Sequence, residues 1–114
     1  MHEYSVFAGS TLIGHTRLET GDPPMGVATG RFLPLPSYAH IQPQCISSRD
    51  MPQAHLALTI VRPTGELLPA VHGVAILDYS VELGEIEVHA VGIGYPLYEE
   101  LFPHQVAAYA RQFG

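Results

Sequence analysis

Lysine, asparagine and tryptophan are missing from this sequence, and cysteine occurs once. Without lysine, the chain cannot carry out Schiff-base catalysis or build a phosphate-binding loop that depends on a lysine. With Cys45 as its one cysteine, it cannot form an intrachain disulfide or a metal site made of several cysteines. We expect Cys45 to be a free, buried thiol, because its neighbours lean apolar.

Long apolar runs are also missing. No stretch reaches the roughly 18 apolar residues of a membrane span, so we predict no transmembrane helix. The first residues have neither the basic segment nor the apolar core of a signal peptide, and we expect a cytoplasmic location. Lysine and asparagine both use A-rich codons, so their joint absence indicates a GC-rich bacterial genome.

Charge is scarce: 14% of the 114 residues are charged, against roughly 25% in typical soluble proteins. A net charge of −6 disfavours nucleic acid and anionic membranes as partners, since both attract basic patches. With 46% hydrophobic residues, some apolar surface should need a cover. A homodimer would supply that cover, and a compact monomer with an uncharged polar surface is the alternative.

The charges are unevenly spread along the chain. No basic residue lies between Arg62 and Arg111, whereas seven of the eleven acidic residues do. This pattern predicts a negative surface in the C-terminal half. Such a surface keeps a protein soluble, or it steers a basic partner toward its binding site.

The pattern along the chain predicts a single α+β domain, residues 1–114. We expect a mainly antiparallel sheet of five to seven strands, open or curled like a barrel, with a C-terminal helical segment packed on one face. Strands are predicted at 4–8, 11–18, 27–33, 55–61, 71–79 and 85–93. A short helix is predicted after Pro36, ending before Pro43, followed by loop.

The last two strands are apolar on both faces at their middle, which predicts a cover over the second face. The C-terminal segment is the expected cover, because its apolar residues follow helical spacing: Phe102, Val106, Tyr109, Ala110 and Phe113. Pro103 should separate this helix from a shorter one that contains Leu97, Tyr98 and Leu101.

The segment Gly21-Asp22-Pro23-Pro24-Met25-Gly26 is the stiffest in the chain. Two consecutive prolines fix the backbone and remove two donors, while the flanking glycines let the chain enter and leave. The segment either presents Asp22 to a ligand or acts as scaffold. In the scaffold interpretation, Met25 enters the core and Asp22 caps backbone donors.

Motifs for catalysis are weak. The seven histidines are widely spaced and form no short metal-binding motif, so we predict no metal and no cofactor. A site assembled from His72 and His89 on paired strands is the remaining possibility. No serine lies in a nucleophile elbow, and the glycines match no dinucleotide fingerprint.

The run from Leu18 to Ala28, followed by Gly30, Phe32 and Pro34, resembles a segment of small uncharacterised bacterial proteins. The resemblance covers about the first third of the chain. It implies a bacterial origin and transfers no activity and no catalytic residue.

Two functional hypotheses follow. The first is a non-enzymatic interaction protein, in its most concrete version an immunity-like neutraliser of a basic protein, by analogy of size and charge. Its partner-binding residues would be Asp78, Glu82, Glu85, Glu87, Glu99 and Glu100. The alternative is a small enzyme or ligand-binding domain with a site near the Asp22-Pro23-Pro24 loop, where the ligand-binding residues would be His15, Arg17 and Asp22.

Overall fold

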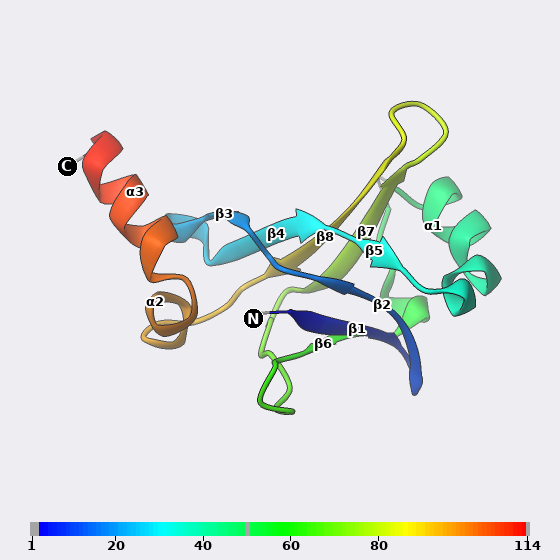
Figure 1. Ribbon diagram of the computed structural model, residues 1–114, viewed down its shortest axis with the longest axis horizontal. Coiled ribbons are helices and arrows are strands. Elements are labelled where there is room, and N and C mark those ends of the chain that lie inside the picture. The colour runs from blue at the N-terminus through cyan, green and yellow to red at the C-terminus, as the bar shows by residue number, and fades with distance from the viewer. Residues whose placement is uncertain (1–2, 50, 114) are drawn as a thin grey trace.

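A computed structural model describes residues 3–49 and 51–113, which form two four-stranded antiparallel sheets with helices at both ends (Figure 1). The strand order is β5-β2-β1-β6 in the first sheet and β3-β4-β8-β7 in the second. The strands are β1 (Tyr4–Ala8), β2 (Thr11–Thr16), β3 (Thr20–Asp22), β4 (Val27–Arg31), β5 (Leu33–Pro34), β6 (Leu58–Val61), β7 (Gly73–Tyr79) and β8 (Glu85–Val91). The α-helices are α1 (Gln42–Ser47), α2 (Leu97–Leu101) and α3 (Pro103–Phe113), and the 3-10 helices are η1 (Pro23–Met25), η2 (Pro36–His40) and η3 (Ala54–Leu56).

The predicted α+β class, its antiparallel pairing and its C-terminal helix are confirmed. The described residues contain eight strands in two sheets, where we predicted five to seven strands in one. The difference comes from β3 and β5, which are three and two residues long. Segments this short carry no clear alternation in the sequence, and their strand geometry depends on pairing with β4 and β2.

One bent hairpin joins the two sheets. Its first arm consists of β2, which pairs with β1, followed by β3. Its second arm consists of β4, which pairs with β3 and β8, followed by β5, which pairs with β2. At the bend, Leu18 has a φ of +48°, and its N–H donates to the Thr16 hydroxyl. Gly30 lies opposite this bend, where a Cβ would come within 2.8 Å of the Leu18 backbone nitrogen. The bend therefore requires glycine at position 30.

The core lies between the two sheets. Val6, Ile60 and Ile13 reach it from the first sheet, and Ile76 and Val88 from the second. The alternation of β7 and β8 follows the prediction: their even-numbered residues face inward, except that Val74 is only partly buried. The odd-numbered residues form the outer face of the second sheet.

The region between residues 36 and 57 contains more helix than its sequence indicates. Pro43, predicted to lie beyond a helix, instead belongs to the first turn of α1, where its missing N–H costs no helical hydrogen bond. Gln53 follows in a loop, yet it is 6% exposed. Its side-chain amide accepts from Ile76 N–H and donates to Ile76 C=O, both at 2.8 Å, and so occupies the outer edge of β7 as a strand would.

The two C-terminal helices pack differently. In α2, Tyr98 is buried with its hydroxyl 2.8 Å from the Val27 carbonyl, and Phe102, directly after the helix, is buried as well. In α3, Gln105 is buried and donates to the Leu18 carbonyl, but Tyr109 and Phe113 are 38% and 66% exposed. The prediction that the whole apolar stripe covers the sheet was wrong. The helix starts beyond the end of the sheet and lies against β3 and η1 (Figure 1).

The Pro-Pro segment is the turn between β3 and β4. Pro23 is buried, and Gly26 closes the turn with a φ of +64° and an N–H bond to the Pro23 carbonyl. The expected core position of Met25 was wrong, since that side chain is 67% exposed. The Asp22 side chain makes no capping hydrogen bond there. The stiffness of this segment thus fixes the β3–β4 turn.

No helix in the described ranges has the length and apolar character needed to cross a membrane.

Candidate binding groove on the second sheet

The six acidic residues predicted to face a partner do not share one surface. Asp78 is fully buried, because it lies on the inward side of β7. Glu82 lies in the β7–β8 turn, and Glu85 and Glu87 lie on β8. Glu99 and Glu100 lie on α2, beyond the other end of β8. The six residues therefore separate into the buried Asp78, a group of three in the β7–β8 turn and on β8, and a pair on α2.

The Asp78 carboxylate is held by four hydrogen bonds. Oδ2 accepts from the Tyr38 hydroxyl at 2.6 Å and from Gln42 Nε2 at 3.1 Å, while Oδ1 accepts from the N–H and the hydroxyl of Ser80. Burial by itself raises the pKa of this carboxyl, but the hydrogen bonds together outweigh it and lower the pKa below its ordinary value. As a surface residue for a partner, the Asp78 prediction was wrong. The residue anchors η2 and α1 to β7.

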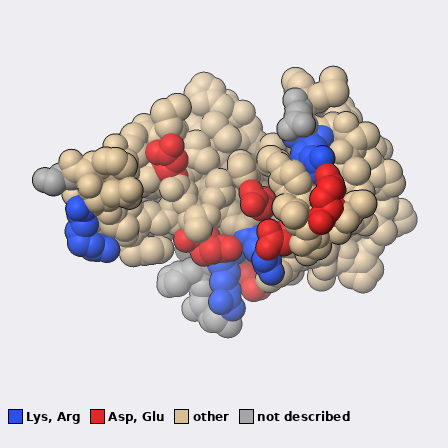
Figure 2. All heavy atoms as spheres, turned by 90° about the horizontal axis from the view of Figure 1, so that it is seen from above, with Lys and Arg blue, Asp and Glu red and all other residues tan. Residues whose placement is uncertain are grey.

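Three of the six glutamates in the base-free segment pair with an arginine from outside it. Glu85 pairs with Arg31 at 2.8 Å, and Glu82 pairs with Arg49 at 2.7 Å. Glu66 pairs in the same way with Arg62 at 3.2 Å. Figure 2 shows the consequence on one face, where acidic and basic groups lie side by side over the middle and right of the molecule. The charge asymmetry along the chain is thus partly balanced in space.

The three residues of the alternative site also separate. His15 lies on β2 and pairs with Leu33 of β5, whereas Asp22 ends β3 and is exposed. Arg17 lies at the bend between β2 and β3 and lines two hollows, and neither hollow is lined by His15 or Asp22. The structure therefore does not gather these three side chains into one site.

The outer face of the second sheet is open to solvent along its length. Its side chains, all partly or fully exposed, are Val27, Thr29, Arg31, Ala75, Leu77, Tyr79, Glu85, Glu87, His89 and Val91. The edge strand β7 contributes the apolar side chains Leu77 and Ala75 to this face, and the acidic Glu85 and Glu87 lie on the neighbouring strand β8. This combination of an apolar strip beside carboxylates is suited to contact with another protein.

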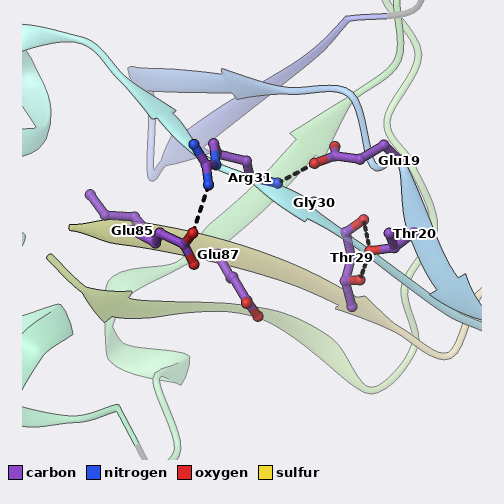
Figure 3. Close-up of a pocket in the computed structure, with 8 residues that line it drawn as sticks. Glu19, Thr20, Thr29, Gly30, Arg31, Glu85 and Glu87 are labelled. Atoms are coloured by element: carbon purple, nitrogen blue, oxygen red, sulfur yellow. Dashed lines mark hydrogen bonds and ion pairs between the residues drawn. The ribbon is translucent and has the colours of Figure 1, made fainter. Parts of the chain in front are cut away.

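A polar groove of about 220 Å³ crosses this sheet near its β3 edge (Figure 3). It is lined by Glu19, Thr20, Thr29, Gly30, Arg31, Glu85, Ile86 and Glu87. Figure 3 shows the Arg31 guanidinium directed at Glu85, while the Arg31 backbone N–H donates to the Glu19 carboxylate at 2.9 Å. The two threonine hydroxyls bond to each other at 2.5 Å. Three carboxylates, two hydroxyls and one arginine thus line the same groove, and the guanidinium of that arginine contacts Glu85.

Among the three groove carboxylates of the described residues, Glu87 forms no hydrogen bond or ion pair with Arg31 and has a histidine as its partner. Its Oε1 lies 3.0 Å from His89 Nε2, an ion pair that exists only when the histidine is protonated. Glu87 has no arginine partner among the described residues, so its carboxylate can accept a cation that enters the groove. A guanidinium or ammonium from another protein fits this environment, because carboxylates and hydroxyls both accept its hydrogen bonds.

The candidates for a metal site and a reactive thiol have these surroundings in the structure. Nowhere among them do three or more histidine, cysteine, aspartate or glutamate side chains gather as metal ligands would. His89, considered as a ligand partner of His72, instead contacts Glu87. Cys45 is fully buried, as predicted, and burial raises the pKa of its thiol, which disfavours the reactive thiolate.

Sequence reasoning found Glu85 and Glu87 but missed Glu19, Arg31 and the two threonines. The alternation of Val27, Thr29 and Arg31 on one face was available in the sequence. Their neighbours were not, because the pairing of β4 with β8 joins segments about 60 residues apart along the chain.

The chain matches no protein-family model, no curated protein and no solved structure.

Proposed function

We propose that this protein is a non-enzymatic binding domain that takes up a basic protein partner on the outer face of its second sheet. The observation that carries the proposal is the groove on the sheet face that Glu19, Glu85 and Glu87 line together with Arg31, whose guanidinium pairs with Glu85. An immunity-like role, in which the groove receives a cationic side chain of a toxin, is the most concrete version. A cytoplasmic location belongs to the same proposal.

The sheet face is a better contact surface than the sheet edge. At the β7 edge, the Gln53 side chain bonds the backbone N–H and C=O of Ile76, and the Arg49 guanidinium donates to the Asp78 carbonyl. At the opposite edge, α3 lies against β3. Both edges are thus partly blocked to an added strand, and side chains on the face supply the recognition.

The Arg31–Glu85 ion pair can be replaced by a pair between Glu85 and an arginine of the partner. Its side chains are 59% and 44% exposed, and an exposed pair of this kind contributes about 0–1 kcal/mol. A partner's arginine can therefore replace Arg31 at Glu85 at little cost. Glu87 adds a second carboxylate two residues along β8, on the same side of the strand.

We expect neutralisation of the groove to weaken binding of a basic partner. The Glu85→Gln/Glu87→Gln protein should bind about tenfold more weakly than the wild type, because two charge-assisted contacts are lost. Partners are captured from the native host on the immobilised full-length protein and identified by mass spectrometry. The affinity of each purified candidate is then measured by calorimetry.

The matched control is Glu66→Gln/Glu99→Gln, which removes the same net charge from residues outside the groove. It should bind like the wild type at ordinary salt. Equal weakening by both double variants would reduce the effect to net charge and contradict a groove-specific contact. Capture of proteins that are not basic on the wild type would contradict the proposal as well.

Self-association is a second part of the proposal. The end of the molecule that carries α2 and α3 exposes large apolar side chains, namely Met25, Tyr95, Tyr109 and Phe113. The Tyr109 and Phe113 rings pack together, with centroids 4.6 Å apart, instead of entering the core. A second copy of the chain would cover this apolar end.

We expect light scattering after size-exclusion chromatography to give the mass of a dimer for the wild type. Tyr109→Ser/Phe113→Ser should give the mass of a monomer with unchanged circular dichroism, because both side chains lie outside the core. Val81→Ser/Leu83→Ser, in the exposed β7–β8 turn, is the control and should remain dimeric. A wild type that is monomeric at every concentration tested would rule out this part of the proposal.

A further inference from the structure

The largest of the described hollows lies away from the polar groove, between the β2–β3 bend and the junction of α2 with α3. Its volume is about 500 Å³, within the range of small-molecule sites. Its lining residues are Tyr4, Arg17, Leu18, Glu19, Glu100, Leu101, Phe102, Pro103 and His104. Nothing in the proposed contact with a basic protein uses this hollow, although Glu19 borders both sites.

The floor of the hollow is aromatic and rigid. The Tyr4 and Phe102 rings are stacked with centroids 6.1 Å apart, and both residues are at least 96% buried. Leu101 and Pro103 add apolar wall. An apolar group of a ligand would be buried mainly against Leu101 and Pro103, with the two rings beneath it.

The rim carries a cation with no ion pair. Among the described residues, Arg31, Arg49 and Arg62 each pair with a glutamate, whereas Arg17 has no such partner. The bend at Leu18, with its positive φ, buries the leucine and leaves Arg17 and Glu19 on the rim on either side of it. An unpaired guanidinium above an apolar floor suits a ligand carboxylate.

The rim also carries a carboxylate from helix α2. Glu100 of α2 is exposed and forms no ion pair among the described residues, while Glu19 is already held by the Arg31 N–H. A ligand with only a negative charge would meet these carboxylates unfavourably. A ligand that also carries an ammonium group would satisfy Glu100 and Arg17 together.

We propose that this hollow binds a small zwitterion with an apolar body, of the class of the aromatic and branched amino acids. Arg17 binds the ligand carboxylate, Glu100 binds its ammonium group, and the Tyr4–Phe102 floor receives its side chain. This binding site shares Glu19 with the groove on the second sheet, and its other lining residues lie outside that groove.

The test uses three probes with the full-length protein: L-phenylalanine, 3-phenylpropionate and phenethylamine. The first carries both charges, the second only the carboxylate and the third only the ammonium. We expect L-phenylalanine to shift the amide resonances of Leu101, Phe102 and His104 in heteronuclear NMR spectra. Each half-ligand should bind at least about tenfold more weakly, since each lacks one charge-assisted contact.

Charge-neutral variants assign the contacts. Arg17→Gln and Glu100→Gln should each raise the Kd for L-phenylalanine about tenfold, whereas the controls Arg111→Gln and Glu99→Gln should leave it unchanged. The groove variant Glu85→Gln/Glu87→Gln should also bind normally, so the two sites can fail separately. The proposal is overturned if L-phenylalanine shifts no amide of the hollow, or if 3-phenylpropionate binds as tightly as L-phenylalanine.

Discussion

Asp78→Ala is expected to destabilise the protein by about 3–5 kcal/mol, since it leaves several buried donors without an acceptor. The variant removes the acceptor of the Tyr38 hydroxyl, of Gln42 Nε2 and of the Ser80 N–H. Asp78→Asn should cost less, about 1–3 kcal/mol, because hydroxyl groups can rotate to accept from the new amide. The free energy of unfolding is measured by urea titration.

The same carboxylate makes stability depend on pH. Its pKa in the folded state lies below the value of about 4 that it has in the unfolded chain. Its stabilising contribution is therefore complete above that unfolded value and is lost as the pH falls through the lower, folded pKa. We expect the gap between the wild type and Asp78→Asn to be full near neutral pH and to narrow below about pH 4.

Asp22→Asn is the control, because Asp22 is exposed and its side chain makes no capping bond. Its unfolding free energy should stay within about 0.5 kcal/mol of the wild type. A constant gap between the wild type and Asp78→Asn across the acid range would contradict a lowered pKa of Asp78 in the folded protein.

Gln53→Leu is expected to destabilise the protein by about 2–4 kcal/mol, although leucine has a similar size. The loss comes from the N–H and C=O of Ile76, which are bonded at 2.8 Å to the glutamine amide and have no such partner in the variant. The free edge of β7 also becomes available to other chains, so light scattering should rise with protein concentration. Amide hydrogen exchange at Ile76 should accelerate more than exchange at Val88 of the central strand β8.

The control for this substitution is Gln44→Ala, which removes an exposed glutamine side chain from α1. It should unfold with the wild-type free energy and show no added scattering. A Gln53→Leu protein as stable as the wild type would mean that water replaces the glutamine amide at this edge.

The charge pattern shows why the acidic residues could be found in the sequence while their environment could not. The base-free segment from Glu66 to Glu100 predicted a negative surface. In the fold, Arg31 and Arg49, which precede that segment in the chain, lie beside Glu85 and Glu82. Ion pairs between residues more than 30 positions apart leave no trace in local composition.

Asp78 shows a second limit of sequence reasoning. The alternation of β7 placed it correctly on the same face as Ile76, which is the buried face. Carboxylates are rarely buried, so its charge favoured a surface role instead. The Tyr38 hydroxyl and Gln42 make this burial tolerable. Tyr38 lies in the short helix that was predicted after Pro36, but the helix α1 that begins at Gln42, and the packing of both helices on β7, were not predicted.

Local patterns in the chain were sufficient for the α+β class, the β7–β8 pairing, the burial of Cys45 and the turn at the Pro-Pro segment, because these follow from periodicity and backbone stiffness. Long-range packing determined which residues meet: Arg31 with Glu85, Gln53 with Ile76, and the β2–β3 bend with α2 and α3. It also determined that the apolar stripe of α3 is exposed. These outcomes depend on pairing between distant segments and on where each element ends, and local patterns encode neither.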